Sequence, residues 1–473
     1  MILSEKYQLT IINRDSLLSS CFLFNFAPQN IILKKHMIEL KGKYTTAKIF
    51  AETIEEGVYQ QVYDIINCPA FEGQAVVCMP DVHVGKSGPC GLVATIGNYI
   101  CPEHIGVDIG CTVSMMILDK KVSPDLYAEL EHKIKTKVPF GFNINDKVII
   151  DEKDFRKFLT KGFNRYSQKW PEMLSDLPDQ VTEKWISEQL ARLNMDEGTF
   201  YKSLGSVGSG NHFVEYDEQT DGDLAGITCH FGSRNFGTKV CNYWMKKTTK
   251  PLTKNEMKEK TEAFKKEYQA SGKTMKEYKQ ALDKFIGDIN SKHINGYLSG
   301  ENMKNYLMDM CFCQLYAQYN HITVQNVIKG ILQKYGIKEV RTITSTHNFV
   351  DLDDHCLRKS AIRAYEGEEM LVPFNMKDGV AICEGLSNTE WLNSCAHGAG
   401  RKMSRSKAKS SVSMEEFKES MKDVYSTTVC KATIDESPMA YKNTDEIKNL
   451  ITETCKIKFM MVPKINIKAA DGI

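Results

Sequence analysis

The segment SCAHGAGR, residues 394–401, places a histidine among small residues and follows it with two glycines and an arginine. Glycine has no Cβ, so a phosphate can approach His397 closely, and imidazole can attack phosphorus to form a covalent N–P bond. Arg401 could neutralise the charge that develops in that step. Taken alone, the string also fits a glycine-rich turn with an incidental histidine, so the choice depends on the rest of the chain.

Composition sets the first limits on function. The 473 residues carry 61 Lys and Arg against 60 Asp and Glu, which gives a net charge of +1. A highly basic chain is therefore excluded, and any contact with nucleic acid must come from local clusters. The 15 cysteines lack the spacing of a secreted disulfide framework, which favours a reducing cytoplasm. No apolar run reaches the roughly 18 residues that cross a bilayer, so no membrane partner is expected.

The N-terminal region contains two possible starting points. The apolar segment 17–26 resembles the core of a signal peptide, but few charges precede it and no clear cleavage site follows. The sequence MIELKG from Met37 reads like a natural start, so we expect residues 1–36 to be an upstream extension and 37–473 to be the catalytic domain. Apolar residues at helical spacing predict an amphipathic helix within 54–65.

Two motifs put metal-ligand side chains at the ends of apolar segments. AVVCMPDVHVG, residues 75–85, is a β-type run that leads Asp81 and His83 into a glycine-containing loop; alone, such residues more often cap turns. In GVDIGC, residues 106–111, a glycine allows a bend that turns Asp108 and Cys111 toward one point. A carboxylate with a thiolate suits Mn²⁺, Fe²⁺ or Zn²⁺ without deciding among them.

Three histidines follow strand-like runs in the same way. They lie in GSGNHFVE (208–215), HFGSR (230–234) and STHN (345–348), and each alone would be read as a structural histidine. Together with the aspartate and the cysteine they make five ligand groups, which exceeds the usual four of one zinc site. Because a thiolate can bridge two ions, the set predicts a two-metal centre for phosphoryl chemistry. Its members are Asp108, Cys111, His212, His230 and His347.

Other regions offer less chemistry. Residues 119–200 are charged and intermittently helical, and we find no reactive motif there. Residues 246–335 predict long helices, with a hairpin at 250–295 followed by a packed helix; their lysines fit a solvated face better than an RNA-binding surface. The densest basic cluster, at 401–409, predicts contacts to backbone phosphates.

The ordered set of motifs resembles the RtcB-type RNA ligases, in a divergent bacterial branch. The matching segments are PDVHVG (80–85), GVDIGC (106–111), GSGNHFVE (208–215), HFGSR (230–234), HN (347–348), HGAGR (397–401), AYKNTDEI (440–447) and the terminal residues 463–468. The resemblance covers about residues 37–473. It implies an α+β fold of stacked, mostly antiparallel β-sheets around the active site, flanked by helices, with a helical insertion at about 246–335.

The resemblance also implies an activity and a set of roles. The family joins RNA ending in a 2′,3′-cyclic phosphate or 3′-phosphate, such as tRNA halves, to RNA with a 5′-hydroxyl, using GTP and two Mn²⁺ ions. The cyclic phosphate is hydrolysed, GMP passes from the histidine to the 3′-phosphate, and the 5′-hydroxyl attacks with release of GMP. His397 would carry GMP, Asp81 would orient or deprotonate it, and Cys111 would be shared by the metals.

Further roles follow from the same resemblance. Asn211, Asn348 and Arg401 would contact nucleotide or RNA phosphates. The remaining nucleotide-binding positions would be Phe213, Glu215, Pro373, Asn375, Met376, Gly398, Ala399, Gly400 and Lys468. One departure stands at Val380, where many relatives offer a serine hydroxyl, so one hydrogen bond to the nucleotide is missing.

Two other functions stay open on the sequence. A di-metal phosphodiesterase would use the same ligands to open cyclic phosphates without ligation. A non-catalytic RNA-binding protein would keep the metal for structure alone. The native RNA and any activating partner are not defined by the sequence.

Overall fold

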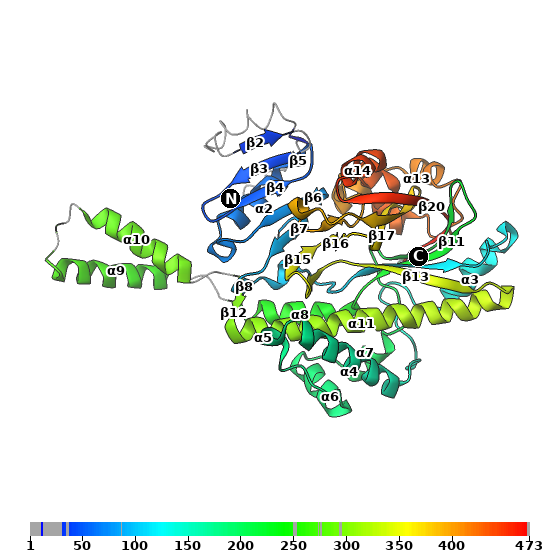
Figure 1. Cartoon of the computed structure of the whole chain (residues 1–473), viewed down its shortest axis with the longest axis horizontal. Coiled ribbons are helices and arrows are strands. Elements are labelled where there is room, and N and C mark those ends of the chain that lie inside the picture. Colours follow the sequence, from blue (N-terminus) through cyan, green and yellow to red (C-terminus); the bar gives the residue numbers. More distant parts are fainter. Residues whose placement is uncertain are drawn as a thin grey trace.

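Two seven-stranded β-sheets form the centre of the molecule, with helices packed around them (Figure 1). The computed structural model describes residues 11–12, 31–34, 37–86, 88–248, 253–272, 274, 277–292 and 296–470. Nearly all strand pairs are antiparallel, and helices and sheets alternate along the chain without a repeating pattern. The predicted α+β fold with mostly antiparallel sheets is therefore confirmed.

The first sheet is entirely antiparallel and curls into a half-barrel. Its strands, in spatial order, are β13 (Glu339–Thr346), β9 (Thr112–Leu118), β11 (Ala225–Phe231), β10 (Phe213–Gln219), β20 (Cys455–Ile467), β18 (Gly379–Gly385) and β17 (Glu369–Asn375). The two edge strands approach each other, because the Leu371 N–H donates to Ser345 Oγ at 2.8 Å. Buried side chains of β9, β13, β17, β18 and β20 fill the space between them, Val380 included.

The second sheet is buried on both faces. Its strands, in order, are β14 (Phe349–Asp351), β15 (Cys356–Lys359), β7 (Cys90–Thr95), β6 (Val76–His83), β4 (Thr46–Ile49), β3 (Met37–Lys41) and β2 (Ile31–Lys34). Only β4 and β6 run parallel. Along β6, Val76 and Cys78 pack into one core while Val77 and Met79 pack into another. This two-sided burial explains the continuous apolar run that precedes Asp81.

Three short strand pairs complete the β structure. They are β1 (Ile11–Ile12) with β5 (Ile54–Glu55), β8 (Tyr99–Ile100) with β12 (Leu298–Ser299), and β16 (Ala361–Arg363) with β19 (Ser394–Ala396). The last pair fixes the chain directly before His397, since Ala361 pairs with Ala396.

Helix α11 (Gly300–Leu332) is the longest helix and lies beneath the first sheet (Figure 1). Apolar side chains surround it, as expected for a helix buried among other elements. The ring of His321 stacks on Phe231 of β11 at a centroid separation of 3.9 Å, and its Nδ1 lies 2.7 Å from Ser114 Oγ of β9. These contacts hold the helix to the strands that carry the candidate ligands.

The other helices lie at the periphery. They are α2 (Glu56–Ile66), α3 (Tyr127–Lys137), α4 (Glu152–Lys169), α5 (Pro171–Leu174), α6 (Glu183–Arg192), α7 (Glu197–Lys202), α8 (Arg234–Met245), α9 (Lys254–Ala270), α10 (Tyr278–Lys292), α12 (Arg405–Ser411), α13 (Met414–Ser420) and α14 (Thr444–Ile451). None of the described helices is both long and apolar enough to span a bilayer.

The segment predicted as a helical insertion contains two different parts. Helices α9 and α10 project from the body as a hairpin (Figure 1), closed by Phe264 and Phe285, whose rings stack at 4.1 Å. Helix α11 belongs to the core instead. The expectation that residues 1–36 form an upstream extension falls largely outside the described residues, of which only β1 and β2 belong to that stretch.

Candidate functional site

The predicted metal ligands lie together where neighbouring strands of the first sheet begin or end. His230 on β11 pairs with Val113 of β9 and Phe213 of β10, and Thr346, the last residue of β13, pairs with Thr112. Cys111, His212 and His347 directly flank these strands, so the sheet register brings them to the same edge. Antiparallel neighbours expose strand ends side by side, which is why residues far apart in sequence meet here.

The five side chains form two groups that share the cysteine. Asp108, Cys111 and His212 make one group, and Cys111, His230 and His347 make the other; in each, the ligand atoms lie within 4.8 Å of one another. His212 Nε2 is 2.8 Å from Asp108 Oδ2 and 3.5 Å from Cys111 Sγ. In the second group, His230 Nε2 and His347 Nε2 face each other at 3.3 Å.

Electrostatics favour a metal in both groups. Burial and the neighbouring histidines hold the pKa values of His230 and His347 well below the ordinary value, so both imidazoles are neutral near pH 7. Two neutral nitrogens that face each other can share only one proton, whereas a cation between them would accept both lone pairs. Burial and Asp108 raise the pKa of the Cys111 thiol, so a metal must displace its proton. The donor set therefore fits divalent cations that accept O, N and S ligands.

His397 lies beside the second group, and a buried carboxylate fixes its orientation. Its Nδ1 is 2.7 Å from Asp81 Oδ2, and its ring centroid is 4.9 Å from that of His347. Asp81 is fully buried at the end of β6. Because a carboxylate oxygen accepts the hydrogen bond, the proton sits on Nδ1 and Nε2 keeps a free lone pair. His397 therefore presents the tautomer that a nucleophile needs.

The glycines after His397 serve the protein's own packing. Gly400 has φ of +71°, and a Cβ there would lie 2.2 Å from the Asp81 carbonyl oxygen. A Cβ on Gly398 would lie 2.7 Å from the carbonyl oxygen of Pro373. From the sequence, we expected these glycines to leave room for a phosphate. At both positions the backbone of β6 or β17 occupies the space where a Cβ would lie.

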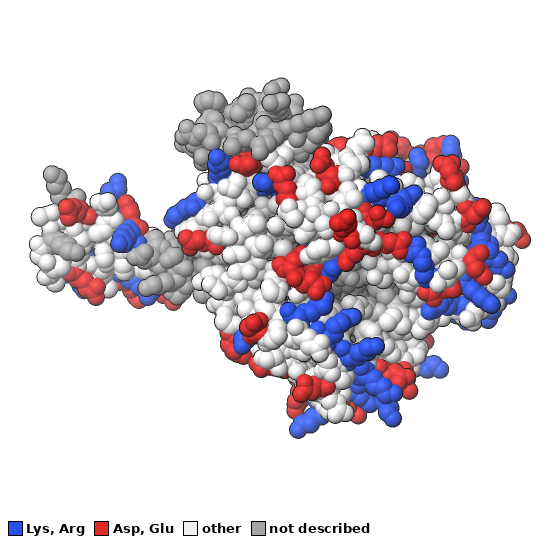
Figure 2. Space-filling model, viewed as in Figure 1, with Lys and Arg blue, Asp and Glu red and all other residues white. Residues whose placement is uncertain are grey.

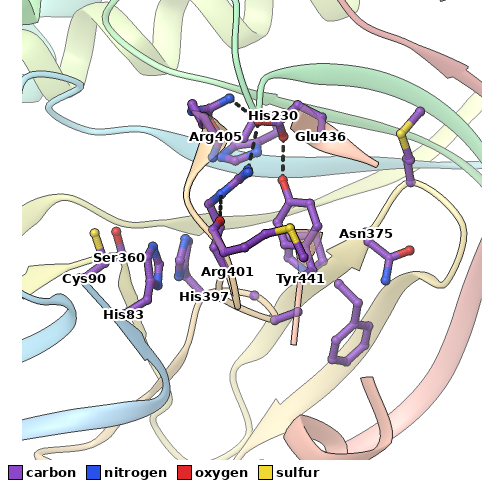
Figure 3. A pocket seen from close by; sticks show the side chains of 18 of the residues that line it. His83, Cys90, His230, Ser360, Asn375, His397, Arg401, Arg405, Glu436 and Tyr441 are labelled. Carbon is purple, nitrogen blue, oxygen red and sulfur yellow. Dashed lines mark hydrogen bonds and ion pairs between the residues drawn. The ribbon is translucent and has the colours of Figure 1, made fainter. Parts of the chain in front are cut away.

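A cavity of about 680 Å³ opens beside His397 and His230 (Figure 3). Its volume lies within the usual range for small-molecule sites. Most of the predicted nucleotide-binding residues line it: Asn211, Phe213, Glu215, Pro373, Asn375, Met376, Gly398, Ala399, Gly400, Arg401 and Lys468. Asn348 is not among its lining residues. Its side chain instead donates to the Asp108 carbonyl at 3.2 Å and accepts from the Ser360 N–H.

Arg401 is held by the protein through a buried carboxylate. Its guanidinium lies 3.2 Å from Glu436 Oε1 and donates to the Asp435 carbonyl at 2.6 Å. Glu436 also pairs with Arg405 and accepts from the Tyr441 hydroxyl (Figure 3). Three cations, Arg401, Arg405 and Lys468, thus surround one carboxylate that the sequence did not single out. Although burial opposes it, their charges lower the pKa of Glu436, so it stays ionised.

Glu215 and Lys468 are buried residues of opposite charge that both line the cavity. Burial raises the pKa of Glu215 to about 7, although Asn466, which donates to it, and Lys468 favour the ionised form. The Lys468 ammonium lies 3.4 Å from the carbonyl oxygens of Gly210 and His212 and 5.3 Å from the centre of the Phe213 ring. Lys468 therefore connects the cavity wall to the loop that carries a metal ligand. Val380 contributes nothing here, because it is buried inside the curled sheet.

A cysteine and histidine pair at the cavity margin was missed by sequence reasoning. Cys90 and Ser360 lie next to His83, which stands beside His397 (Figure 3). His83 Nδ1 donates to the Asp81 carbonyl at 2.9 Å. Although burial raises the pKa of the Cys90 thiol, the charge of His83, with help from Lys359, lowers it to about 6. The six residues between His83 and Cys90 contain no motif that would pair them, because only the turn between β6 and β7 brings the two together.

Cys90 is expected to react with iodoacetamide about ten times faster than an ordinary cysteine at pH 7, since the thiolate is the nucleophile and is already the main form. Its labelling rate should rise between pH 5 and 7 and then level off. Cys68, whose pKa burial raises, serves as the internal control. Mass spectrometry of peptides after brief labelling measures both rates, and a Cys90 rate that still climbs above pH 8 would contradict the assignment.

The arrangement combines a candidate metal centre with a histidine oriented by a buried carboxylate, a combination that suits phosphoryl transfer through a side-chain nucleophile. A family model described as tRNA-splicing ligase RtcB matches residues 61–469. The chain is 30% identical over 414 residues to RNA-splicing ligase RtcB of Escherichia coli (strain K12), covering 83% of this chain and 90% of that protein. Because the family model spans most of the sequence, the chain belongs to the RtcB family.

More distant relatives extend the match beyond bacteria. The tRNA-splicing ligase RtcB of Archaeoglobus fulgidus is 24% identical over 459 residues, covering 86% of this chain and 89% of that protein. RNA-splicing ligase RtcB homolog 2 of Entamoeba dispar is 26% identical over 447 residues, covering 83% and 80%.

Proposed function

We propose that this protein is an RNA ligase that joins 3′-phosphate or 2′,3′-cyclic phosphate ends to 5′-hydroxyl ends, with GTP and Mn²⁺. The observation that carries the proposal is the position of His397, whose Nε2 is free because Asp81 holds Nδ1. The ring also lies 4.9 Å from the His347 ligand, inside a cavity large enough for a nucleotide. Family membership supports an RNA substrate.

In the first step, Nε2 of His397 attacks the α-phosphorus of GTP. An N–P bond forms, the bond from that phosphorus to the pyrophosphate oxygen breaks, and Asp81 stabilises the charge that the ring acquires. The RNA 3′-phosphate then takes GMP from His397, and the 5′-hydroxyl oxygen finally attacks the activated phosphorus and releases GMP. A cyclic end must first be hydrolysed to the 3′-phosphate.

Asp108, Cys111, His212, His230 and His347 would hold two manganese ions. When bound, these ions supply electrostatic stabilisation of phosphate oxygens and of leaving groups. The protein's own contribution is orientation. Lys468 and Arg405 bring positive charge to the cavity wall, and the buried Glu436 keeps Arg401 in place.

The part of the cavity lined by Phe213 and Glu215 suits guanine. Phe213 offers a ring face, and Glu215 offers a carboxylate that could accept from the N1–H and exocyclic amine of the base. Adenine has no such pair of donors on that edge. We infer that Glu215 selects the guanine nucleotide.

Guanosine affinity should fall by about tenfold per unit as the pH drops below about 7, because Glu215 then takes up a proton and loses its acceptor role. Guanosine is the right probe because it lacks phosphates that titrate in this range. Calorimetry between pH 5.5 and 8.5 measures the effect. Glu215→Gln should bind weakly and without this pH dependence; an unchanged wild-type affinity across the range would refute the role.

The proposal as a whole is tested with two RNA fragments and purified protein. One fragment ends in a 2′,3′-cyclic phosphate and the other begins with a 5′-hydroxyl. Gel analysis should show a joined product only when both GTP and Mn²⁺ are present. Conversion of the cyclic end without joining, in the presence of GTP and Mn²⁺, would favour a phosphodiesterase and overturn the ligase assignment.

A further inference from the structure

A row of like charges winds along the exposed side of helix α4. Lys153, Lys157, Lys161, Arg165 and Lys169 recur at every fourth position, and all five are exposed. Residues four apart lie above one another on a helix, so the cations repeat about every 6 Å along its axis. The helix carries six Lys or Arg against two acidic residues, in a chain whose net charge is only +1. Figure 2 shows blue side chains in the region where Figure 1 places α4.

An ordinary solvated helix face does not explain this row. Like charges at i and i+4 repel each other and destabilise a helix, whereas solvated faces commonly alternate the sign of charge. Helix α9 shows the ordinary pattern, with Lys258 paired to Glu262 four residues on. On α4, Lys157 pairs with Asp154 and Lys169 pairs with Asp353.

The remaining three cations of the row have no such compensation. Lys153, Lys161 and Arg165 form no ion pair with any described residue, so their charge is available to a polyanion. A bound polyanion would neutralise these charges and so relieve the repulsion along the helix.

An exposed aromatic ring lies in the loop before this helix. Phe142 is 88% exposed, more than any other large apolar side chain in the described ranges. Its neighbour Gly141 is fixed, because its N–H donates to the Gly208 carbonyl at 3.2 Å and its carbonyl accepts from Arg234 at 2.7 Å. A ring exposed to this extent suits a planar partner. Nucleobases stack on such rings, regardless of sequence, when they are unpaired.

A continuous series of contacts connects the ring to the metal ligands. Gly208 touches His212, since a Cβ on Gly208 would lie 2.2 Å from His212 Nδ1. Gly208 also accepts from Gly141, the residue before Phe142. The loop containing Phe142 therefore packs on the loop that delivers a metal ligand.

Further along, the same two segments stay together as far as the start of α4. The Asn145 side chain donates to the Leu204 carbonyl at 2.9 Å, and the Phe155 ring on α4 packs edge-on against Tyr201 at 6.2 Å. The route from His212 to the first cation of the row is thus built from adjoining segments of ordered chain.

We propose that Phe142 and the cationic row of α4 form a docking track for a single strand of RNA that leads to the metal site. Unpaired bases stack on Phe142, and the following phosphates lie along Lys153, Lys157, Lys161 and Arg165. The inference rests on the proposed function, because it names the surface that would hold the RNA near His397.

The test measures RNA binding without chemistry. The probe is a fluorescent 20-nucleotide single strand with hydroxyl groups at both ends, which cannot react, bound to Mn²⁺-loaded protein at several salt concentrations. The track variant is K153Q/K157Q/K161Q/R165Q, and the ring variant is Phe142→Ala. A matched control, K258Q/K260Q/K265Q/K266Q, removes the same charge from four exposed lysines of α9. A charge-preserving variant, K153R/K157R/K161R, reports on changes of shape alone.

The track variant should bind at least tenfold more weakly at low salt, and its plot of log K against log salt should be shallower by about 2 to 3, at ~0.7 per phosphate contact. Phe142→Ala should lose about tenfold with an unchanged salt slope, and Phe142→Trp should restore binding. The α9 control and the arginine variant should stay within about twofold of wild type. Equal loss in the α4 and α9 variants, or wild-type binding by Phe142→Ala, would overturn the proposal.

Labelling with GTP separates this result from the proposed function. Every variant should still accept GMP from radiolabelled GTP at the wild-type rate, which also shows that it is folded. If the wild-type protein takes up GMP but the α4 variant binds RNA normally, the track is wrong and the ligase assignment stands. If no variant takes up GMP but the RNA results are as expected, the track stands and the ligase assignment fails.

Discussion

Replacing His397 by alanine is expected to abolish covalent labelling of the protein by α-labelled GTP. The imidazole is the proposed nucleophile, and no other described side chain places a free ring nitrogen between Asp81 and the His347 ligand. Ligation should fall by at least about 10³-fold, as is usual when a nucleophile is removed. Denaturing gels after incubation with radiolabelled GTP and Mn²⁺ measure the label directly.

Asp81→Asn is the matched control for orientation. The amide keeps the shape of the carboxylate but can donate toward Nδ1, which favours the opposite tautomer and removes the free lone pair from Nε2. We expect labelling to slow by about 10²-fold or more without loss of bound metal. Label that persists in His397→Ala would disprove the nucleophile. Opening of cyclic phosphates in that variant would be compatible with the proposal, since hydrolysis does not use His397.

Replacing Cys111 by alanine should remove manganese from both sites at once. Its sulfur belongs to both ligand groups, whereas every other ligand belongs to only one. The number of manganese ions that stay bound after dialysis should fall from two per chain to fewer than one. The affinity for any remaining ion should fall by at least about 100-fold, which exceeds the effect of losing an outer-shell partner.

His212→Ala is the comparison that makes the result specific. His212 belongs only to the group with Asp108, so that variant should keep one ion, held by Cys111, His230 and His347. A cysteine variant that still binds two ions, or a histidine variant that loses both, would contradict the shared-thiol arrangement. Mn²⁺ binding should also release a proton from Cys111 and strengthen with rising pH, because burial raises the pKa of that thiol.

The convergence of these five side chains, which the structure shows, could be predicted from the sequence for a physical reason. His230 and His347 lie at or directly after the end of a strand, and Cys111 and His212 lie directly before the start of one. Such boundaries are recognisable where an apolar run meets glycine or a polar residue. Antiparallel pairing then brings those ends to one edge. Strands β10 and β11 form a hairpin of neighbouring segments, but the pairing of β9 with β11 and with β13 was not predictable, because these contacts join segments more than 100 residues apart.

Other parts of the site could not be read from local patterns. The cations that contact Glu436 are Arg401 and Arg405, which lie 35 and 31 residues upstream, and Lys468, which follows β20. The sequence around Glu436 therefore indicates neither its burial nor its partners. The basic cluster at 401–409 was predicted to contact phosphates, yet Arg401, Arg405 and Lys409 each pair with Asp435 or Glu436. The lysine spacing of α4 was visible in the sequence, but only the structure shows that the chain leading into this helix packs on residues 204–208.

The place of β20 in the first sheet has a consequence for biosynthesis. This strand, residues 455–467, is made late yet sits in the middle of the sheet, between β10 and β18. When synthesis has passed β11 but not β20, the edge of β10 that pairs with β20 is still unpaired. Such an edge can pair with other chains. Productive folding depends on shielding that edge until translation has passed residue 467, so slow synthesis of the intervening residues 232–454 would increase the demand for chaperones.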